Sequence, residues 1–340
     1  MIIESSAPTR VDLAGGTIDI WPLYLFHPGG KTVNYALSLR ARVRIETRDD
    51  DRIFLESRDR GVHFETTLGR LDELARDERL ALVSKMVHFF RPEVGFHLTA
   101  HSEAPAGAGI SGSSALAIAL IGGLNRLVGN RYEEHQFITI AANVETTVIK
   151  VPAGIQDYYP AFYGSTSCIH LRADGVEREH LVIDENQLER RFVICYTGEP
   201  RHSGINNWDI FKRHIDGDAE LFTIFERIRD AAVHMRSALL AGDWNEVAET
   251  MRTAYPNRKR LAPGITTPQM DRLVEKALAA GAEAAKVCGA GGGGCIAFLC
   301  NEGRKENVER ALLEEGAEVL KWKVSREGLL VSEATAVRNS

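Results

Sequence analysis

The sequence lacks several features that would assign it to a common class at once. No run of apolar residues approaches the roughly 18 that a membrane-spanning helix needs. The stretch from Met1 to Ser6 has neither the basic nor the apolar region of a signal peptide. The formal net charge is −6, whereas nucleic-acid-binding proteins are more often basic. We therefore expect a cytoplasmic protein with no membrane partner and no nucleic-acid partner.

Cysteine is scarce, and the commonest catalytic motifs are missing. No G-x-x-x-x-G-K-[ST] string occurs, which excludes a P-loop protein. The absence of HExxH and GxSxG removes the simplest protease and esterase interpretations. No CxxC pair is present, so reduced and mostly buried thiols are expected for the five cysteines, Cys168, Cys195, Cys288, Cys295 and Cys300.

The first half of the chain alternates between strand and helix patterns. Apolar and polar residues alternate over 37–45 and again over 95–103, which predicts strands with one buried face. Residues 71–91 mix apolar and charged residues at helical spacing. The small, apolar residues from Ser113 to about Leu127 predict a buried helix.

The second half is richer in helices. Residues 218–253 predict two amphipathic helices, broken near Gly242. A further helix is expected from the N-cap Thr267, with Pro268 in its first position, to Gly281. The pattern then predicts strands at 284–288, 295–300 and 317–324 and a helix at 304–315. Without a steady βαβ rhythm, these elements indicate an α+β protein with two lobes, joined around 170–195.

A glycine-rich loop lies between the expected strand at 95–103 and the expected helix from Ser113. Glycine allows the backbone to turn tightly and to approach a ligand closely. The N–H groups at a helix start attract phosphate, and serine hydroxyls there can bind phosphate or Mg²⁺. The loop therefore predicts an anion-binding site made by Pro105, Gly107, Gly109, Ser111, Gly112, Ser113 and Ser114.

This loop also fits the G-x-G-x-x-G pattern of dinucleotide-binding proteins, so an NAD-binding dehydrogenase is an alternative. Such a site requires an early βαβ unit and an acidic residue after the next strand. Glu133 and Glu134 stand near the right distance, but they follow Gly129 and precede a helix pattern. A glycine turn that only permits close packing is a further alternative.

A second glycine loop covers residues 289–294, between two apolar strands. Glycine costs roughly 0.5–1 kcal/mol relative to alanine inside an element, so such a run suggests a ligand against the backbone. A flexible hairpin tip is the structural alternative. We assign ligand binding here to Gly289, Gly291 and Gly292.

Three segments in this order resemble the GHMP kinase superfamily, which includes kinases of galactose, homoserine, mevalonate and phosphomevalonate. They are residues 7–19, the loop at 105–115 and the segment 286–295, which matches the motif K-x-x-G-A-G-G-G-G. The resemblance implies an N-terminal lobe (1–185) like the second domain of ribosomal protein S5 and a ferredoxin-like C-terminal lobe (186–340), with ATP between them.

Two carboxylates are the expected catalytic groups. Phosphoryl transfer needs a cation on the phosphate oxygens and a group that accepts the proton of the attacking hydroxyl. Mg²⁺ prefers oxygen ligands, so a helical Glu and a serine hydroxyl suit it. The resemblance implies that Glu145 and Ser114 bind Mg²⁺, that Asp157 is the base, and that Arg10 stabilises the transferred phosphate and keeps Asp157 ionised.

The acceptor is expected to lie near the first segment. The resemblance places Asp19 on sugar hydroxyls, and Gly15-Gly16-Thr17-Ile18-Asp19 resembles the Gly-Gly-Thr-Asp string of bacterial D-glycero-D-manno-heptose 7-phosphate kinases, with Ile18 inserted. Arg201, in a polar loop with His202 and Ser203, is a further expected substrate contact. The basic residues 257–260 are expected to form a solvated turn.

These observations predict an ATP- and Mg²⁺-dependent kinase that phosphorylates a small molecule. The favoured acceptor is the anomeric hydroxyl of D-glycero-D-manno-heptose 7-phosphate. The alternatives are a galactokinase-like aldose 1-kinase, a mevalonate-type alcohol kinase, the NAD-binding dehydrogenase, and an inactive family member that only binds ligands. A monomer or a homodimer is expected.

Overall fold

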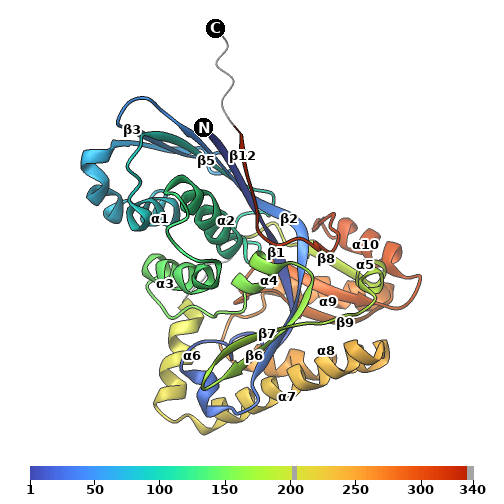
Figure 1. Ribbon diagram of the computed structural model, residues 1–340. Coiled ribbons are helices and arrows are strands. Elements are labelled where there is room, and N and C mark those ends of the chain that lie inside the picture. The colour runs from blue at the N-terminus through green and yellow to red at the C-terminus, as the bar shows by residue number, and fades with distance from the viewer. Residues whose placement is uncertain (201–204, 335–340) are drawn as a thin grey trace.

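The computed structural model describes residues 1–200 and 205–334 of the 340-residue chain. Two sheets, each covered by helices, form two lobes that meet along β1 (Figure 1). Among the described residues, no helix combines the length and the hydropathy required to cross a bilayer.

The larger sheet has eight strands in the order β12-β1-β2-β5-β3-β4, and β6 joins β2 to β7. All pairs are antiparallel except β3 with β5. This arrangement is not the doubly wound parallel sheet of a dinucleotide-binding domain. The strands are β1 (Ile2–Ala14), β2 (Lys31–Thr47), β3 (Arg52–Ser57), β4 (Val62–Thr67), β5 (Phe96–Ser102), β6 (Thr166–Arg172), β7 (Gly175–His180) and β12 (Leu330–Ala334).

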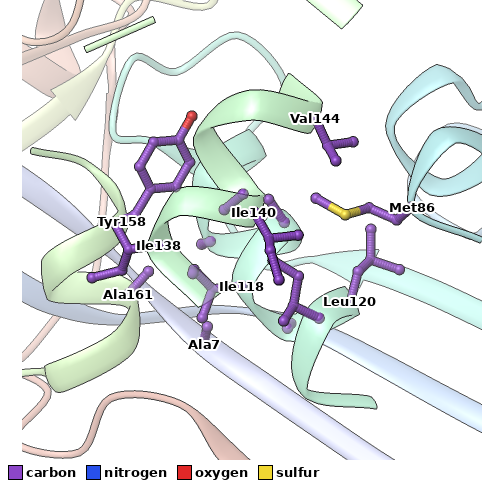
Figure 2. Packing of buried hydrophobic residues seen from close by; sticks show 14 of the residues in the cluster. Ala7, Met86, Ile118, Leu120, Ile138, Ile140, Val144, Tyr158 and Ala161 are labelled. Atoms are coloured by element: carbon purple, nitrogen blue, oxygen red, sulfur yellow. The ribbon is translucent and has the colours of Figure 1, made fainter. Parts of the chain in front are cut away.

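The helix α2 packs on β1 and β2, and α1, α3 and α4 surround it. Close packing needs a small residue, because a Cβ on Gly122 would lie 2.9 Å from Ser5 Oγ. The side chains between these helices form one buried apolar cluster (Figure 2). The helical segments of this lobe are η1 (Leu23–Phe26), η2 (Leu68–Arg76), α1 (Ala81–Phe90), α2 (Gly112–Leu127), η3 (Glu134–Gln136), α3 (Phe137–Ile149) and α4 (Tyr158–Tyr163).

The smaller sheet has four antiparallel strands in the order β11-β8-β10-β9. One face packs on α9 and α10. The other face packs on α7 and α8 and continues into the core formed by the second half of β1. The elements are α5 (Glu185–Arg191), β8 (Phe192–Tyr196), α6 (Ile205–Ile215), α7 (Ala219–Ala241), α8 (Trp244–Arg260), α9 (Pro268–Ala280), β9 (Ala282–Val287), β10 (Cys295–Cys300), α10 (Lys305–Glu314) and β11 (Glu318–Val319).

The two-lobed α+β fold predicted from the sequence is confirmed. The caps of α9 are as expected: the Thr267 hydroxyl accepts the N–H of Met270 at 3.2 Å, and Gly281 ends the helix in a left-handed conformation. The division between residues 185 and 186 stays a prediction, since β12 returns to the larger sheet. All five cysteines are buried, and no disulfide joins them within the described residues.

Two expected elements differ from the structure. The helical pattern at 71–91 is divided into η2 and α1, because the backbone at Asp77 is extended and ends η2, and α1 begins only at Ala81. The expected strand at 317–324 is short, since β11 ends at Val319 and the chain crosses to the larger sheet, where Val324 bridges Leu37.

An ion pair joins the lobes. Lys286 on β9 donates to Asp12 on β1 at 2.9 Å, and the two side chains are 13% and 4% exposed. Burial alone would raise the pKa of Asp12, but the charges of Lys286 and Arg10 lower it below its ordinary value. Asp12 therefore stays ionised inside the protein, and its charge depends on these cations.

We expect Lys286→Met to lower the free energy of unfolding by about 3 kcal/mol, because it leaves a buried carboxylate without its main partner. Urea unfolding measures this change. The matched control is Lys276→Met, which removes a pair with Glu315 whose lysine is 58% exposed. In the control variant, the free energy of unfolding should fall by less than about 1 kcal/mol. Equal losses in the two variants would contradict a structural role for the buried pair.

Candidate active site

The first glycine loop joins β5 to α2 and turns through three left-handed residues, Gly107, Gly109 and Ser111. Ser111 is the N-cap of α2 but makes no capping bond with its side chain. The first N–H groups of a helix have no partner inside the helix, so they remain available to an anion. All seven residues predicted from this loop line a cavity of about 510 Å³.

The second glycine loop lies directly against the first. The N–H of Cys295 donates to the carbonyl of Ala108 at 2.7 Å. A Cβ on Gly294 would lie 2.7 Å from that same carbonyl oxygen, so this approach requires glycine. Gly289 lines the cavity with Ala290. Gly291 instead packs on Ile265, where a Cβ would meet the carbonyl oxygen at 2.4 Å.

Arg10 and Asp157 form an ion pair that lines the cavity. Nε of Arg10 donates to Oδ1 of Asp157 at 2.8 Å, and Nη1 donates to the carbonyl of Gly109 at 3.1 Å. Burial alone would lower the pKa of Arg10, but the charges of Asp157 and Asp12 raise it. The guanidinium therefore stays charged and connects β1, the first glycine loop and the start of α4.

Glu145, on α3, is surrounded by hydroxyl groups. It accepts hydrogen bonds from Ser113 at 2.5 Å, from Ser114 at 3.1 Å and from Tyr158 at 2.8 Å. Burial raises the pKa of Glu145, the three hydroxyls lower it, and the charge of Asp157 adds to the increase. These oxygen atoms at the start of α2 form a cluster of the kind that Mg²⁺ prefers.

Asp19 is buried at the cavity wall. Its carboxylate accepts the N–H of Thr17 at 3.1 Å and the N–H of Gln156 at 2.9 Å. Burial and the neighbouring charge of Asp157 raise the pKa of Asp19 to about 6. Thr17 itself has a left-handed φ of +86°, which β-branched residues rarely adopt. Gly16, Thr17 and Asp19 all line the cavity. Arg201 lies outside the described residues.

The structure corrects the interpretation of residues 257–260, which are not a solvated turn. They form the end of α8, and the side chain of Arg258 reaches into the cavity. Its guanidinium donates to the carbonyl of Gly16, the hydroxyl of Thr17 and the carbonyl of Gly289. The sequence pattern does not single out Arg258, because four neighbouring polar residues hide which one faces inward.

The chain is similar to proteins with established descriptions. Residues 81–165 match the GHMP kinases N-terminal domain, and residues 235–318 match the GHMP kinases C-terminal domain. D-glycero-alpha-D-manno-heptose 7-phosphate kinase of Campylobacter jejuni is 24% identical, with 96% of this chain and 98% of that protein covered. Mevalonate kinase of Pyrococcus furiosus is 26% identical, with 98% of this chain and 99% of that protein covered.

Solved structures share the fold. A D-glycero-D-manno-heptose 1-phosphate kinase from Bacteroides thetaiotaomicron superposes with a TM-score of 0.78 at 24% identity, covering 98% of this chain and 100% of that one. Galactokinase of Lactococcus lactis, solved with galactose, superposes with a TM-score of 0.77 at 20% identity, covering 97% of this chain and 95% of that one.

The paired lobes and the two matching domains define a phosphotransferase that acts on an alcohol group. The chain belongs to the GHMP kinases, which use ATP as the phosphate donor.

The raised pKa of Asp19 predicts a stability effect with a definite sign. A carboxyl whose pKa is about 6 when folded and 3.8 ordinarily opposes folding increasingly as pH rises through this window. The free energy of unfolding of the wild type, relative to Asp19→Asn, should therefore fall by about 1 kcal/mol between pH 5 and pH 7. Urea unfolding at both pH values measures the difference, and a constant difference would contradict the buried, raised-pKa carboxyl.

Proposed function

We propose that this GHMP kinase transfers the γ-phosphate of ATP to a sugar hydroxyl. The observation that carries the proposal is the convergence of the first glycine loop, part of the second loop, the Arg10–Asp157 pair and Glu145 on one cavity of about 510 Å³. A nucleotide held by the loops would place its terminal phosphate beside Asp157. The lobe assignments, 1–185 and 186–340, belong to this proposal.

In this proposal, the backbone N–H groups at the start of α2 bind the phosphates. Glu145 and Ser114 would hold Mg²⁺, and their buried oxygen cluster supports that choice. When bound, Mg²⁺ supplies charge neutralisation on the phosphate oxygens. The surrounding hydroxyls of Ser113 and Tyr158 keep the carboxylate of Glu145 oriented toward the loop.

Asp157 accepts the proton of the acceptor hydroxyl as the new P–O bond forms. Arg10 holds this carboxylate through Nε at 2.8 Å and places a positive charge beside the transferred group. Much of the rate enhancement comes from position and charge.

The favoured acceptor is D-glycero-D-manno-heptose 7-phosphate, phosphorylated at its anomeric hydroxyl. The similarity to the Campylobacter jejuni kinase supports it, as do the strings Gly-Gly-Thr and Gln156-Asp157-Tyr158. An aldose without phosphate and a mevalonate-type alcohol are the other candidates, because a galactokinase and mevalonate kinases are also similar. Cytoplasmic location and a monomer or homodimer stay predictions.

A panel of acceptors tests the substrate. With Mg-ATP, the protein should phosphorylate D-glycero-D-manno-heptose 7-phosphate with a kcat/KM at least about 100-fold above that for galactose or mevalonate. Coupled ADP release measures the rates, and NMR of the product identifies the phosphorylated carbon. A preference for galactose or mevalonate would overturn the choice of acceptor and leave the kinase assignment intact.

Two substitutions separate the proposed roles of the carboxylates. Asp157→Asn should lower kcat by about 100-fold or more and leave ATP binding near the wild-type value, since it removes the proton acceptor. Glu145→Gln should instead raise the magnesium concentration needed for half-maximal activity, because it removes a charged oxygen ligand. Steady-state assays at several magnesium concentrations and isothermal titration with ATP measure both. Near-wild-type turnover of Asp157→Asn, or unchanged magnesium dependence of Glu145→Gln, would contradict the respective role.

A further inference from the structure

Three buried polar atoms in the cavity wall have no hydrogen-bond partner among the described residues. They are Oδ1 of Asp12, Oε1 of Gln156 and Nε of Arg258. All three side chains line the cavity that contains Asp157. Buried polar atoms are nearly always hydrogen-bonded in proteins, so unpartnered atoms of side chains that line a ligand cavity point to groups that a ligand supplies.

The three side chains converge on Gly16. A Cβ on Gly16 would lie 2.2 Å from Oδ2 of Asp12 and 3.1 Å from Nε2 of Gln156. The carbonyl of Gly16 accepts a hydrogen bond from Nη1 of Arg258 at 3.3 Å. The backbone at Gly16 therefore forms a common floor, and any side chain there would displace Asp12 or Gln156.

Arg258 is held in place from two directions. Its Nη1 atom binds the segment at Gly16 and Thr17, and its Nη2 atom binds the carbonyl of Gly289 in the second glycine loop. These bonds connect α8, the first segment of the chain and the C-terminal loop. Because the guanidinium group is planar and rigid, the same bonds fix the position of Nε, which remains available as a donor.

The chemistry of the three atoms distinguishes between acceptor classes. Oδ1 of Asp12 and Oε1 of Gln156 accept hydrogen bonds, and Nε of Arg258 donates one. A hydroxyl can donate and accept, so neighbouring hydroxyls satisfy the whole set. A carboxylate only accepts, so it would leave Oδ1 of Asp12 and Oε1 of Gln156 without a donor.

Of the nearby cations, Lys286 and Arg10 are each paired with a carboxylate, whereas Arg258 contacts only uncharged groups. Lys286 binds Asp12 at 2.9 Å, Arg10 binds Asp157 at 2.8 Å, and the Nη atoms of Arg258 bind backbone carbonyls and the hydroxyl of Thr17.

We propose that Asp12, Gln156 and Arg258 form a hydroxyl-binding subsite beside Asp157, which selects a polyhydroxylated acceptor over a carboxylate-bearing alcohol. This inference rests on the proposed sugar-kinase function and adds the residues that determine its specificity. Gln156 and Arg258 bind and orient the acceptor, whereas Asp157 takes its proton.

The test uses the full-length protein with Mg-ATP and D-glycero-D-manno-heptose 7-phosphate. Gln156→Leu keeps the size of the side chain and removes its polar atoms, and Arg258→Met removes the donor. Each should raise the KM for the sugar by about 10-fold or more and change the KM for ATP by less than about twofold. The matched control is Arg260→Met, since Arg260 is 52% exposed and pairs with Glu220. It should leave both constants unchanged.

Monodeoxy analogues of the same sugar phosphate separate a direct contact from a structural effect. One analogue lacks the hydroxyl that Gln156 binds. The wild-type enzyme should have a higher KM for this analogue than for the intact sugar phosphate, and the Gln156→Leu variant should have no higher KM for it than the wild type has. For the other analogues, the effect of the missing hydroxyl on KM and the effect of Gln156→Leu on KM should be independent of each other. The ratio of kcat/KM for the sugar to that for mevalonate should also fall in Gln156→Leu.

An unchanged sugar KM in both variants would overturn the subsite, as would an equal rise in the KM for ATP or purely additive losses for every analogue. Failure of the proposed function looks different, because it appears in the wild type. A wild-type protein that phosphorylates mevalonate better than the sugar, or that phosphorylates neither, would overturn both proposals.

Discussion

The contact between the two glycine loops is the constraint on which the site depends. The N–H of Cys295 reaches the carbonyl of Ala108 at 2.7 Å, and this is possible because residue 294 has no side chain. The loops lie far apart in the sequence and belong to different lobes, so this bond fixes how the lobes meet. Arg10 and Arg258 add side-chain bonds across the same region, to Gly109 and to Gly289.

Several carboxylates, most of them buried, lie around this contact, and three have side-chain partners. Asp12 is held by Lys286, Asp157 by Arg10, and Glu145 by three hydroxyl groups. Asp19 has only backbone N–H donors within 3.1 Å among the described residues, and burial raises its pKa to about 6. The carboxylates therefore differ in their surroundings and in their partners, as different roles in one cavity require.

Much of this site could be predicted from the sequence, because glycine runs and helix starts carry local signals. The seven residues assigned in the loop at 105–115, together with Glu145 and Asp157, line the cavity, as does Arg10. Arg258 could not be found in this way, since only the packing of α8 decides which of its last basic residues faces inward. Asp12 and Lys286 were missed as a pair for the same reason, as their contact spans 274 positions. The strand β1 was not predicted, because strand patterns are weak where both faces are buried.

The last strand of the larger sheet has a consequence for synthesis on the ribosome. β12 comprises residues Leu330–Ala334, and it covers the edge of β1, which begins at Ile2. Until β12 leaves the exit tunnel, β1 has one open edge that could pair with another nascent chain. The larger sheet is thus completed only after the strands of the smaller sheet have been translated.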